Sequence, residues 1–449
     1  MKSTSIELRQ KDTAVVSLVE ELSEHPDLSS EEIAKKLGLS REELLECYDI
    51  IRGNEELQRH IIEMSVAPRL TNETSDLLTK YGSYVTELIS GERVHPLILE
   101  FHPGPVCNSR CGFCFSDHWE YAEYVLGEDL ISGDRVLEIF DECWQNGVKE
   151  IWFSGGKEPF INPLTPEYIR AANQIGLRTK VYTNGISMTR QAQESVLDSY
   201  QVRISCSGAK PSTFNKIQFP MLNNSQSDSI HNKVIENVAS LVRLKNEKNK
   251  KVKICMSQIL QPLNHDEMLE FANLGLRLGV DSVHFRLEAM GMVREFTDYE
   301  KETMLSEIAE LKKNHNGIEL DIRGVAEGEF ESRETQFLPR LTKPTLCRAG
   351  LLKRGLNPYG ALYNCEFSSH PRFRIDCAHC RLGDAKQESI GEILRRNVGQ
   401  YPHTCALCQA HEYGLNIALE KIQRDLEYGI PVDRQPYCRG PNNGQGGIS

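Results

Sequence analysis

The middle of the chain alternates short apolar runs with longer amphipathic stretches, and this alternation constrains the fold more than any other feature. Six apolar runs have the length and content of buried strands: 97–102, 149–154, 178–183, 201–206, 251–258 and 282–287. Segments with helical periodicity separate and follow them: 134–145, 164–176, 230–247, 265–278 and 299–313. This repeat predicts an α/β fold with a parallel sheet, covering helices and an active site at the carboxyl ends of the strands. Because a closed barrel needs about eight repeats, the six predict a partial (β/α)6 barrel, open on one side.

The regions on either side of this pattern have a different character. A length of 449 residues is too great for one ordinary domain. We expect a helical N-terminal domain, the partial barrel, and a cysteine-rich C-terminal domain with a disordered tail, over 1–92, 93–330 and 331–449. In the first of these, Ser29 with Glu32 and Ser40 with Glu43 fit the capping box of a helix start, which predicts a helix-turn-helix.

The charge balance argues against a nucleic-acid partner. The chain has a net charge of −12, and its first 60 residues hold eight Lys and Arg against fourteen Asp and Glu. A helix-turn-helix of this composition would present carboxylates to phosphates, so we expect a docking or lid function instead. The sequence has neither a signal-like N-terminus nor an apolar run of about 18 residues, which predicts a cytoplasmic protein with no membrane partner.

The fourteen cysteines are more consistent with metal ligands or buried thiols than with disulfides in such a compartment. Cys107, Cys111 and Cys114 lie on one short loop directly after the first predicted strand. Three thiolates can ligate three irons of a 4Fe–4S cluster and leave the fourth iron open to chelate S-adenosylmethionine (SAM). A zinc loop is the alternative, but a tetrahedral zinc site needs about four ligands, commonly in two pairs.

A second motif, Ser-Gly-Gly-Lys-Glu-Pro, ends the second predicted strand. Gly155 and Gly156 allow close approach of a ligand to the backbone, and Glu158 offers a carboxylate to an ammonium group. With the cysteine loop, these residues resemble the radical SAM superfamily over residues 93–330. The resemblance implies that the Gly-Gly-x-Glu-Pro segment binds the SAM amino group and that further side chains complete the SAM site, namely Phe113 near the adenine, Asn184, Ser205 and Arg286.

The downstream cysteines resemble the SPASM and twitch domains that follow many radical SAM barrels. Their spacing, with Gly360 and a Leu-Gly-Asp segment, implies an auxiliary 4Fe–4S cluster whose ligands would be Cys347, Cys365, Cys405 and Cys408. Three other cysteines, Cys377, Cys380 and Cys438, fall outside that pattern and could serve a second cluster, a zinc site or part of the first set. A zinc ribbon built from two C-x2-C pairs is the alternative to an auxiliary cluster.

The segments Phe-His-Pro-Gly-Pro-Val-Cys and Tyr-Thr-Asn-Gly are similar to radical SAM enzymes of deoxysugar and aminoglycoside biosynthesis, of the TDP-4-amino-4,6-dideoxyglucose deaminase type. This similarity implies hydrogen abstraction by a 5′-deoxyadenosyl radical from a carbon of a carbohydrate or aminocyclitol, such as an amino sugar or a nucleotide sugar. A flavodoxin- or ferredoxin-type donor would supply the electron. A base is also needed, and the candidates are Asp117, His118, Tyr121, Tyr124 and Glu288.

The outcome of the reaction stays open at this level. The deaminase pattern lacks the C-terminal cysteines, whose spacing instead resembles the twitch domain of aminocyclitol dehydrogenases. Elimination of water or ammonia and dehydrogenation are therefore both compatible with the sequence. Two other classes are a SPASM-type maturase that modifies a ribosomal peptide, and a non-catalytic iron–sulfur regulator.

Overall fold

We describe a computed structural model of the chain. The structure describes residues 13–22, 28–52, 80–92, 95–114, 130–154, 157–221, 224–288, 293–314, 317–322, 346–347, 349–364, 381–396, 401–402, 419 and 422–431. The chain divides into two compact units, each treated by itself below. The first comprises Met1–Val94, Thr342–Leu352 and Val398–Ser449, and the second His95–Leu341 and Lys353–Asn397.

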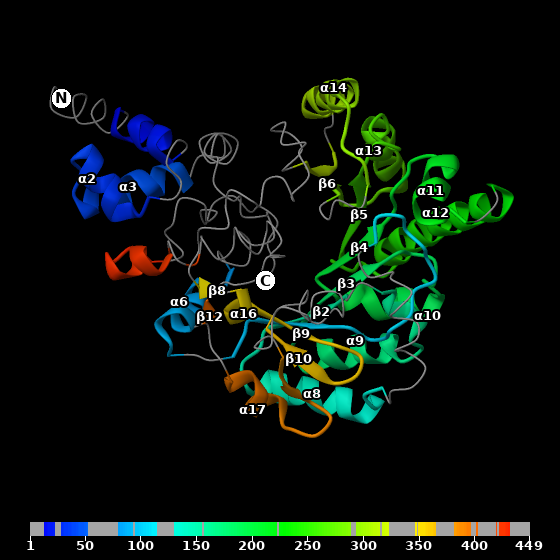
Figure 1. The fold of residues 1–449 in the computed structure, drawn as a ribbon, viewed down its shortest axis with the longest axis horizontal. Helices are drawn as coiled ribbons and strands as arrows, with labels where there is room; N and C mark the ends of the chain where they lie inside the picture. The colour runs from blue at the N-terminus through cyan, green and yellow to red at the C-terminus, as the bar shows by residue number, and fades with distance from the viewer. Residues whose placement is uncertain are drawn as a thin grey trace. The chain divides into compact units, whose positions relative to one another are not determined.

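The second unit is built on one sheet, whose strand order within the described residues is β11-β10-β9-β1-β2-β3-β4-β5-β6-β7 (Figure 1). The first seven strands along the chain pair in parallel: β1 (Ile98–Phe101), β2 (Glu150–Phe153), β3 (Arg178–Thr183), β4 (Gln201–Ser205), β5 (Lys253–Leu260), β6 (Ser282–Leu287) and β7 (Glu319–Asp321). The strand β9 (Lys353–Leu356) pairs in parallel with the free side of β1, and β10 (Ala361–Tyr363) and β11 (Arg381–Asp384) continue the sheet in antiparallel pairs.

The α/β class with a mostly parallel sheet is confirmed, and all six predicted strands are present. Four further strands, β7, β9, β10 and β11, were not expected. Each is only three or four residues long, which is too short to show a period. In addition, β9 begins with Lys353 and Arg354 and has no apolar run that would indicate a strand. Residues 353–397 therefore belong to the sheet unit. The three predicted domains, including the cysteine-rich one, stay a prediction.

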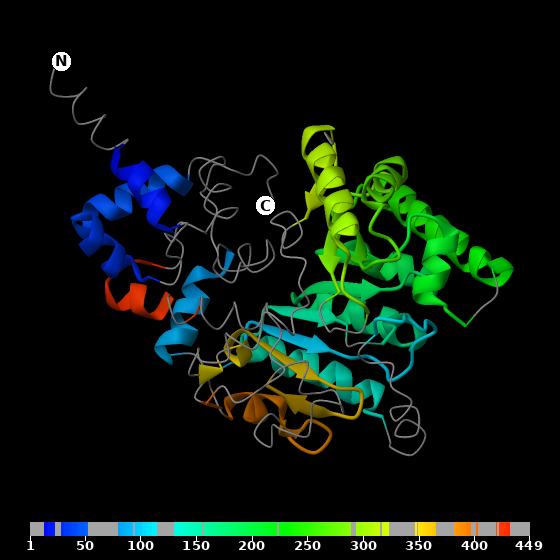
Figure 2. The same ribbon diagram turned by 45° about the horizontal axis from the view of Figure 1, so that its top comes forward.

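Helices connect most of the strands along the chain and cover one side of the sheet (Figure 2). They are α8 (Gly133–Gln145), α9 (Thr165–Gln174), α10 (Arg190–Ser195), α11 (Pro211–Gln218), α12 (Asn224–Glu247), α13 (Met268–Leu278), α14 (Asp298–Asn314) and, after β11, α17 (Ile390–Arg395). Local signals set their ends. The Ser132 side chain caps α8 by accepting from the Arg135 amide, and Gly279 ends α13 in the left-handed region with φ 76°.

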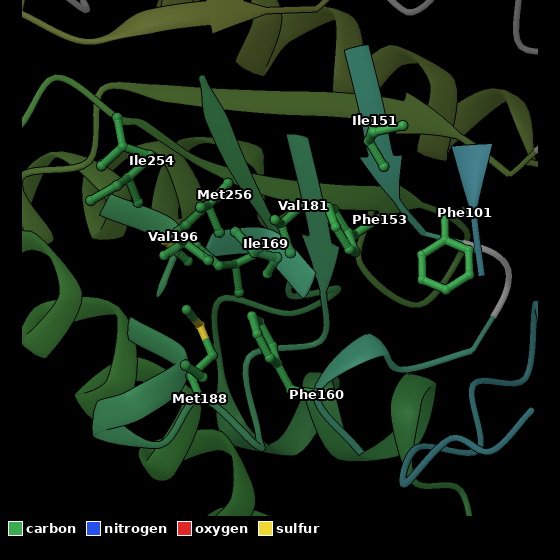
Figure 3. Packing of buried hydrophobic residues seen from close by; sticks show 14 of the residues in the cluster. Phe101, Ile151, Phe153, Phe160, Ile169, Val181, Met188, Val196, Ile254 and Met256 are labelled. Atoms are coloured by element: carbon green, nitrogen blue, oxygen red, sulfur yellow. The ribbon is translucent and has the colours of Figure 1, made fainter. Parts of the chain in front are cut away.

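The core of this unit lies between the sheet and these helices. Alternate strand residues, among them Phe101, Ile151, Phe153 and Val181, point to the helices and are buried there (Figure 3). Phe101 and Phe153 meet edge to face, with ring centroids 5.9 Å apart. The intervening strand residues, such as Trp152 and Lys180, occupy the opposite, inner face of the sheet.

Where its residues are described, the first unit is mostly helical, with one short pair of strands. Its labelled elements are α2 (Ser30–Leu37), α3 (Arg41–Arg52), α6 (Gly82–Ser90), β8 (Leu346–Cys347), α16 (Ala349–Leu352) and β12 (Tyr401–Pro402). Both predicted capping boxes form: the Ser29 amide donates to Glu32 Oε2 at 2.7 Å, and the Ser40 amide to Glu43 Oε2 at 2.8 Å. In the part of the chain that is described, no helix combines the length and apolar character needed to cross a membrane.

Candidate active site

The cysteine loop follows the carboxyl end of β1 and is fastened to the end of α11. The amides of Arg110 and Gly112 donate to the carbonyls of Gln218 and Ile217, at 3.0 Å and 2.9 Å. These two bonds join segments about a hundred positions apart in the sequence. They hold the loop that carries Cys107, Cys111 and Cys114, which form no disulfide and are partly exposed.

Ser109 lies between two of these thiols. Its amide donates to Cys107 Sγ at 3.4 Å, and its hydroxyl lies 3.2 Å from both Cys111 Sγ and the Gln218 carbonyl. Burial raises the pKa of Cys111 to about 12, and the charges of Cys114 and Cys107 add to it. Ser109 thus contacts two of the three cysteine sulfurs on this loop.

The loop fits a 4Fe–4S cluster better than a single ion. Within the described ranges, no three side chains of His, Cys, Asp or Glu are arranged to hold one metal ion. A cubane makes a different demand, because each thiolate binds its own iron. Three cysteines on one loop, none of them in a disulfide, could bind three irons and leave one iron for another ligand.

Glu158 stands at the start of the short 3-10 helix Pro159–Ile161, after β2, and is only 2 % exposed. Its Oε1 accepts from the Phe160 amide at 3.1 Å and from the Thr183 hydroxyl at 2.7 Å, and its Oε2 accepts from the Asn184 amide at 2.7 Å. Burial raises the pKa of this carboxyl to about 7, although the three hydrogen bonds oppose the shift. The carboxylate thus joins the ends of β2 and β3, whereas the sequence suggested contact with the SAM ammonium group, which stays a prediction.

Asn184 connects this buried junction to the cysteine loop. Its side-chain amide donates to Asn108 Oδ1 at 2.7 Å and lies 3.8 Å from Cys107 Sγ. Asn108 in turn donates to the Ser187 hydroxyl at 3.0 Å. In addition, the Glu158 amide donates to the Val106 carbonyl at 3.2 Å. The ends of β1, β2 and β3 therefore form one hydrogen-bonded layer around Cys107.

Other predicted site residues lie on later strands or in turns. Ser205 stands opposite Ser257 of β5, and Arg286 stands opposite Ile259 near the carboxyl end of β6. The Glu288 amide, just past β6, donates to the Leu260 carbonyl at 3.0 Å. Phe113 is partly buried in the turn before Cys114. No hydrogen bond described here joins these four side chains to the layer around Cys107, so their functions stay predictions.

Several predicted site residues lie outside the described residues. They are Asp117, His118, Tyr121, Tyr124, Gly155, Gly156, Cys365, Cys377, Cys380, Cys405, Cys408 and Cys438. Of the predicted auxiliary ligands, Cys347 is described for its backbone, which pairs with Tyr401 between β8 and β12.

Sequence reasoning overlooked a set of charged residues on the inner face of the sheet. Lys180 of β3 and Arg203 of β4 are buried, and β1 and β6 contribute the buried Glu100 and His284. A signal was present, since Lys180 and Arg203 occupy strand positions that alternate with core residues. A charge at such a position lies on the inner face, where it needs a partner.

Parts of the chain are similar to known proteins. Residues 101–221 match the family model of the radical SAM superfamily. The chain is 30 % identical over 158 residues to an S-adenosylmethionine-dependent nucleotide dehydratase of Flammeovirga pacifica, a match covering 34 % of this chain and 53 % of that protein. It is 26 % identical over 303 residues to a GTP 3′,8-cyclase of Clostridium perfringens, which covers 66 % of this chain and 87 % of the cyclase.

A solved structure of Streptococcus suis SuiB bound to its precursor peptide SuiA superposes with a TM-score of 0.49 and 15 % identity, covering 76 % of this chain and 75 % of that one. The matched segment spans about half the length of the nucleotide dehydratase. The family match begins at Phe101, at the end of β1, and includes the cysteine loop, Glu158, Asn184 and α11, which together form the site. The segment that carries the site is therefore the part of the chain that matches the radical SAM superfamily.

Proposed function

We propose that the chain binds a 4Fe–4S cluster through Cys107, Cys111 and Cys114 and acts on the carbohydrate part of a small molecule. The observation that supports this most directly is the loop with three cysteines, none of them in a disulfide, which two backbone hydrogen bonds fasten to α11. When bound there, a cluster would supply the electron that cleaves SAM into methionine and a 5′-deoxyadenosyl radical. This radical would take a hydrogen atom from a substrate C–H bond.

The chain's own residues position these components. Glu158 fixes the ends of β2 and β3 from beneath, and Asn184 holds Asn108 beside the first cysteine. The Gly155-Gly156 backbone, Ser205, Arg286 and Phe113 are proposed to contact SAM. Asp117, Tyr121 and Glu288 are proposed as the groups that remove the hydroxyl proton of the substrate.

A sugar-containing substrate is supported by the relatives. The names of the two relatives refer to a nucleotide and to GTP, and every nucleotide contains a pentose. Elimination of water or ammonia and dehydrogenation both begin with hydrogen abstraction beside a hydroxyl or amine. An auxiliary cluster on Cys347, Cys365, Cys405 and Cys408, which we also propose, would accept the electron that dehydrogenation releases. A flavodoxin- or ferredoxin-type protein is the proposed reductant.

The test is anaerobic incubation of the reconstituted full-length chain with SAM, dithionite and a panel of nucleotides, nucleotide sugars and amino sugars. We expect 5′-deoxyadenosine in every reaction and a substrate-derived product in one class. Mass spectrometry distinguishes loss of two hydrogens from loss of water or of ammonia. Absence of 5′-deoxyadenosine would refute the cluster assignment. Turnover of a peptide, with every sugar inert, would favour a maturase.

A further inference from the structure

One side chain of α12 holds the turn that follows Asn184. The Asn237 side-chain amide donates to the Gly185 carbonyl at 2.8 Å and to the Ile186 carbonyl at 3.3 Å. A carbonyl oxygen can only accept, so these two partners require the NH2 end of the Asn237 amide to face the turn. Asn237 is partly buried and lies 52 positions after Gly185 in the sequence. The contact is therefore one between separate elements and not a local property of the turn.

The turn packs closely against the elements around it. Gly185 has φ 77°, in the left-handed region. A Cβ at this position would lie 2.9 Å from Ile204 Cγ2 of β4 and 3.2 Å from Val234 Cγ1 of α12. The Ile186 amide donates to Asn184 Oδ1 at 3.0 Å, which fixes the Asn184 side chain relative to the turn. The position of that side chain thus depends on a turn that α12 supports.

Asn184 joins the turn to the cysteine loop. Its side-chain amide donates to Asn108 Oδ1 at 2.7 Å and lies 3.8 Å from Cys107 Sγ. Asn108 donates to the Ser187 hydroxyl at 3.0 Å, so two side-chain hydrogen bonds connect the loop with this turn. A shift of the turn would therefore move a donor that lies beside the first cysteine sulfur.

The helix that carries Asn237 is also tied to the helix that supports the cysteine loop. α11 and α12 pack against each other, and Asn215 of α11 donates to Asp228 Oδ1 of α12 at 2.7 Å (Figure 1). The end of α11 accepts from the Arg110 and Gly112 amides of the loop. One pair of packed helices thus contacts both the loop and the turn.

We propose that Asn237 is a positioning residue for the cluster site, which fixes the turn and, through Asn184, the donor beside Cys107. The proposal rests on the proposed function, because it takes Cys107 as a ligand of the cluster. Hydrogen bonds to cluster sulfurs raise the reduction potential, so displacement of the Asn184 amide should lower it. Ser240 of α12 provides a matched contact away from the site, since its hydroxyl donates to Gln193 Oε1 of α10 at 2.8 Å.

The experiment uses the full-length chain, reconstituted anaerobically with iron and sulfide. Asn237→Asp keeps the shape of the side chain but replaces the NH2 group by an oxygen, and Asn237→Leu removes both hydrogen bonds without adding a charge. In EPR-monitored redox titrations, both variants should shift the potential downward while the iron content stays the same. In an Asn184→Ala background neither should cause a further shift, because the donor that Asn237 positions is then absent. Ser240→Ala should cause no shift in either background.

Hydrogen exchange of the chain without a cluster gives a second readout, which does not depend on iron. Asn237→Asp should make the amides of residues 183–187 and 106–112 exchange about tenfold faster, as expected for the loss of one hydrogen bond. Ser240→Ala should leave exchange in both segments unchanged. Thermal unfolding identifies a variant that has lost its fold, and the other Asn237 variant then decides.

Three results would overturn the proposal. They are an unchanged potential in the Asn237 variants, equal shifts in the native and Asn184→Ala backgrounds, and faster exchange in residues 183–187 without any change in residues 106–112. Formation of 5′-deoxyadenosine by the native chain shows independently whether the proposed function holds. If the native chain binds no iron at Cys107, that function is refuted, and hydrogen exchange alone decides whether Asn237 positions the loop.

Discussion

The layer around Cys107 and the inner face of the sheet are adjacent in the same unit, but they satisfy their polar groups in different ways. Around Cys107, the two oxygens of Glu158 accept three hydrogen bonds from the chain itself, and Asn184 has a protein acceptor. On the inner face, Lys353 pairs with Glu100 at 3.2 Å, and Lys180 lies 4.7 Å from the centre of the Trp152 ring and 4.9 Å from that of Tyr182. The first region is held by hydrogen bonds to one buried carboxylate, whereas the second is held by an ion pair and by contacts between cations and aromatic rings. The difference indicates where rigidity should be tested.

The largest effect should come from the cysteines. Replacing Cys107, Cys111 and Cys114 together by Ala should abolish 5′-deoxyadenosine formation, because no thiolate would remain to hold the iron. Iron and sulfide analysis of the same variant should show about four irons retained if the auxiliary cluster exists. Cys143→Ala, a buried thiol on α8, is the control and should keep full activity. SAM cleavage by the triple variant would show that the loop is not the cluster site.

A smaller effect is expected from the buried carboxylate. Glu158→Gln keeps one acceptor oxygen but turns an NH2 group toward the amides or hydroxyl that now donate to it. The free energy of unfolding should fall by about 1–3 kcal/mol, as for other buried donors left without an acceptor. Urea denaturation measures this change. The control is Glu167→Gln, because Glu167 is an exposed residue of α9. Loss of SAM affinity with unchanged stability would instead support direct contact between Glu158 and SAM.

The buried Glu158 should also make the free energy of unfolding depend on pH. Burial raises the pKa of Glu158 to about 7, above its ordinary value, so the folded chain favours the protonated form. Its contribution to stability is therefore complete at low pH and is lost as the pH rises through about 7. Between about pH 4.5 and pH 8 the loss would reach about 3 kcal/mol. Urea denaturation of the native chain and of Glu158→Gln across this range should show the slope in the native chain alone.

The smallest effect concerns Ser109. Its hydroxyl lies 3.2 Å from Cys111 Sγ, and hydrogen bonds to cluster sulfurs raise the reduction potential. Ser109→Ala should leave iron content unchanged and shift the potential slightly downward in an EPR-monitored redox titration. Ser187→Ala, which contacts Asn108 but no sulfur, is the comparison. An unshifted potential would mean that the hydroxyl hydrogen is directed only to the Gln218 carbonyl.

Periodicity was sufficient for six strands and five helices between residues 97 and 314, but it missed α10 and α11, which have only six and eight residues. It failed for β9, where Lys353 is stabilised by Glu100, a residue that precedes it by more than 250 positions. The position of the cysteine loop, after the first strand, was predictable from the sequence. The function of Glu158 was not, because the donors that occupy its oxygens include Thr183 and Asn184 of a different strand. Lys180 and Arg203 were visible as charges at strand positions that alternate with core residues, but their proximity depends on strand register.

The pairing of β9 with β1 also has a consequence for how the chain is made. The strand that leads into the cysteine loop lies between β2 and β9 in the sheet, yet β9 is translated some 250 residues later. Until then β1 is an edge, with one row of backbone groups open to other chains. The sheet around β1, which leads into the cysteine loop, is therefore among the last parts to be completed during synthesis. A chain that stops before residue 353 leaves the edge of β1 uncovered.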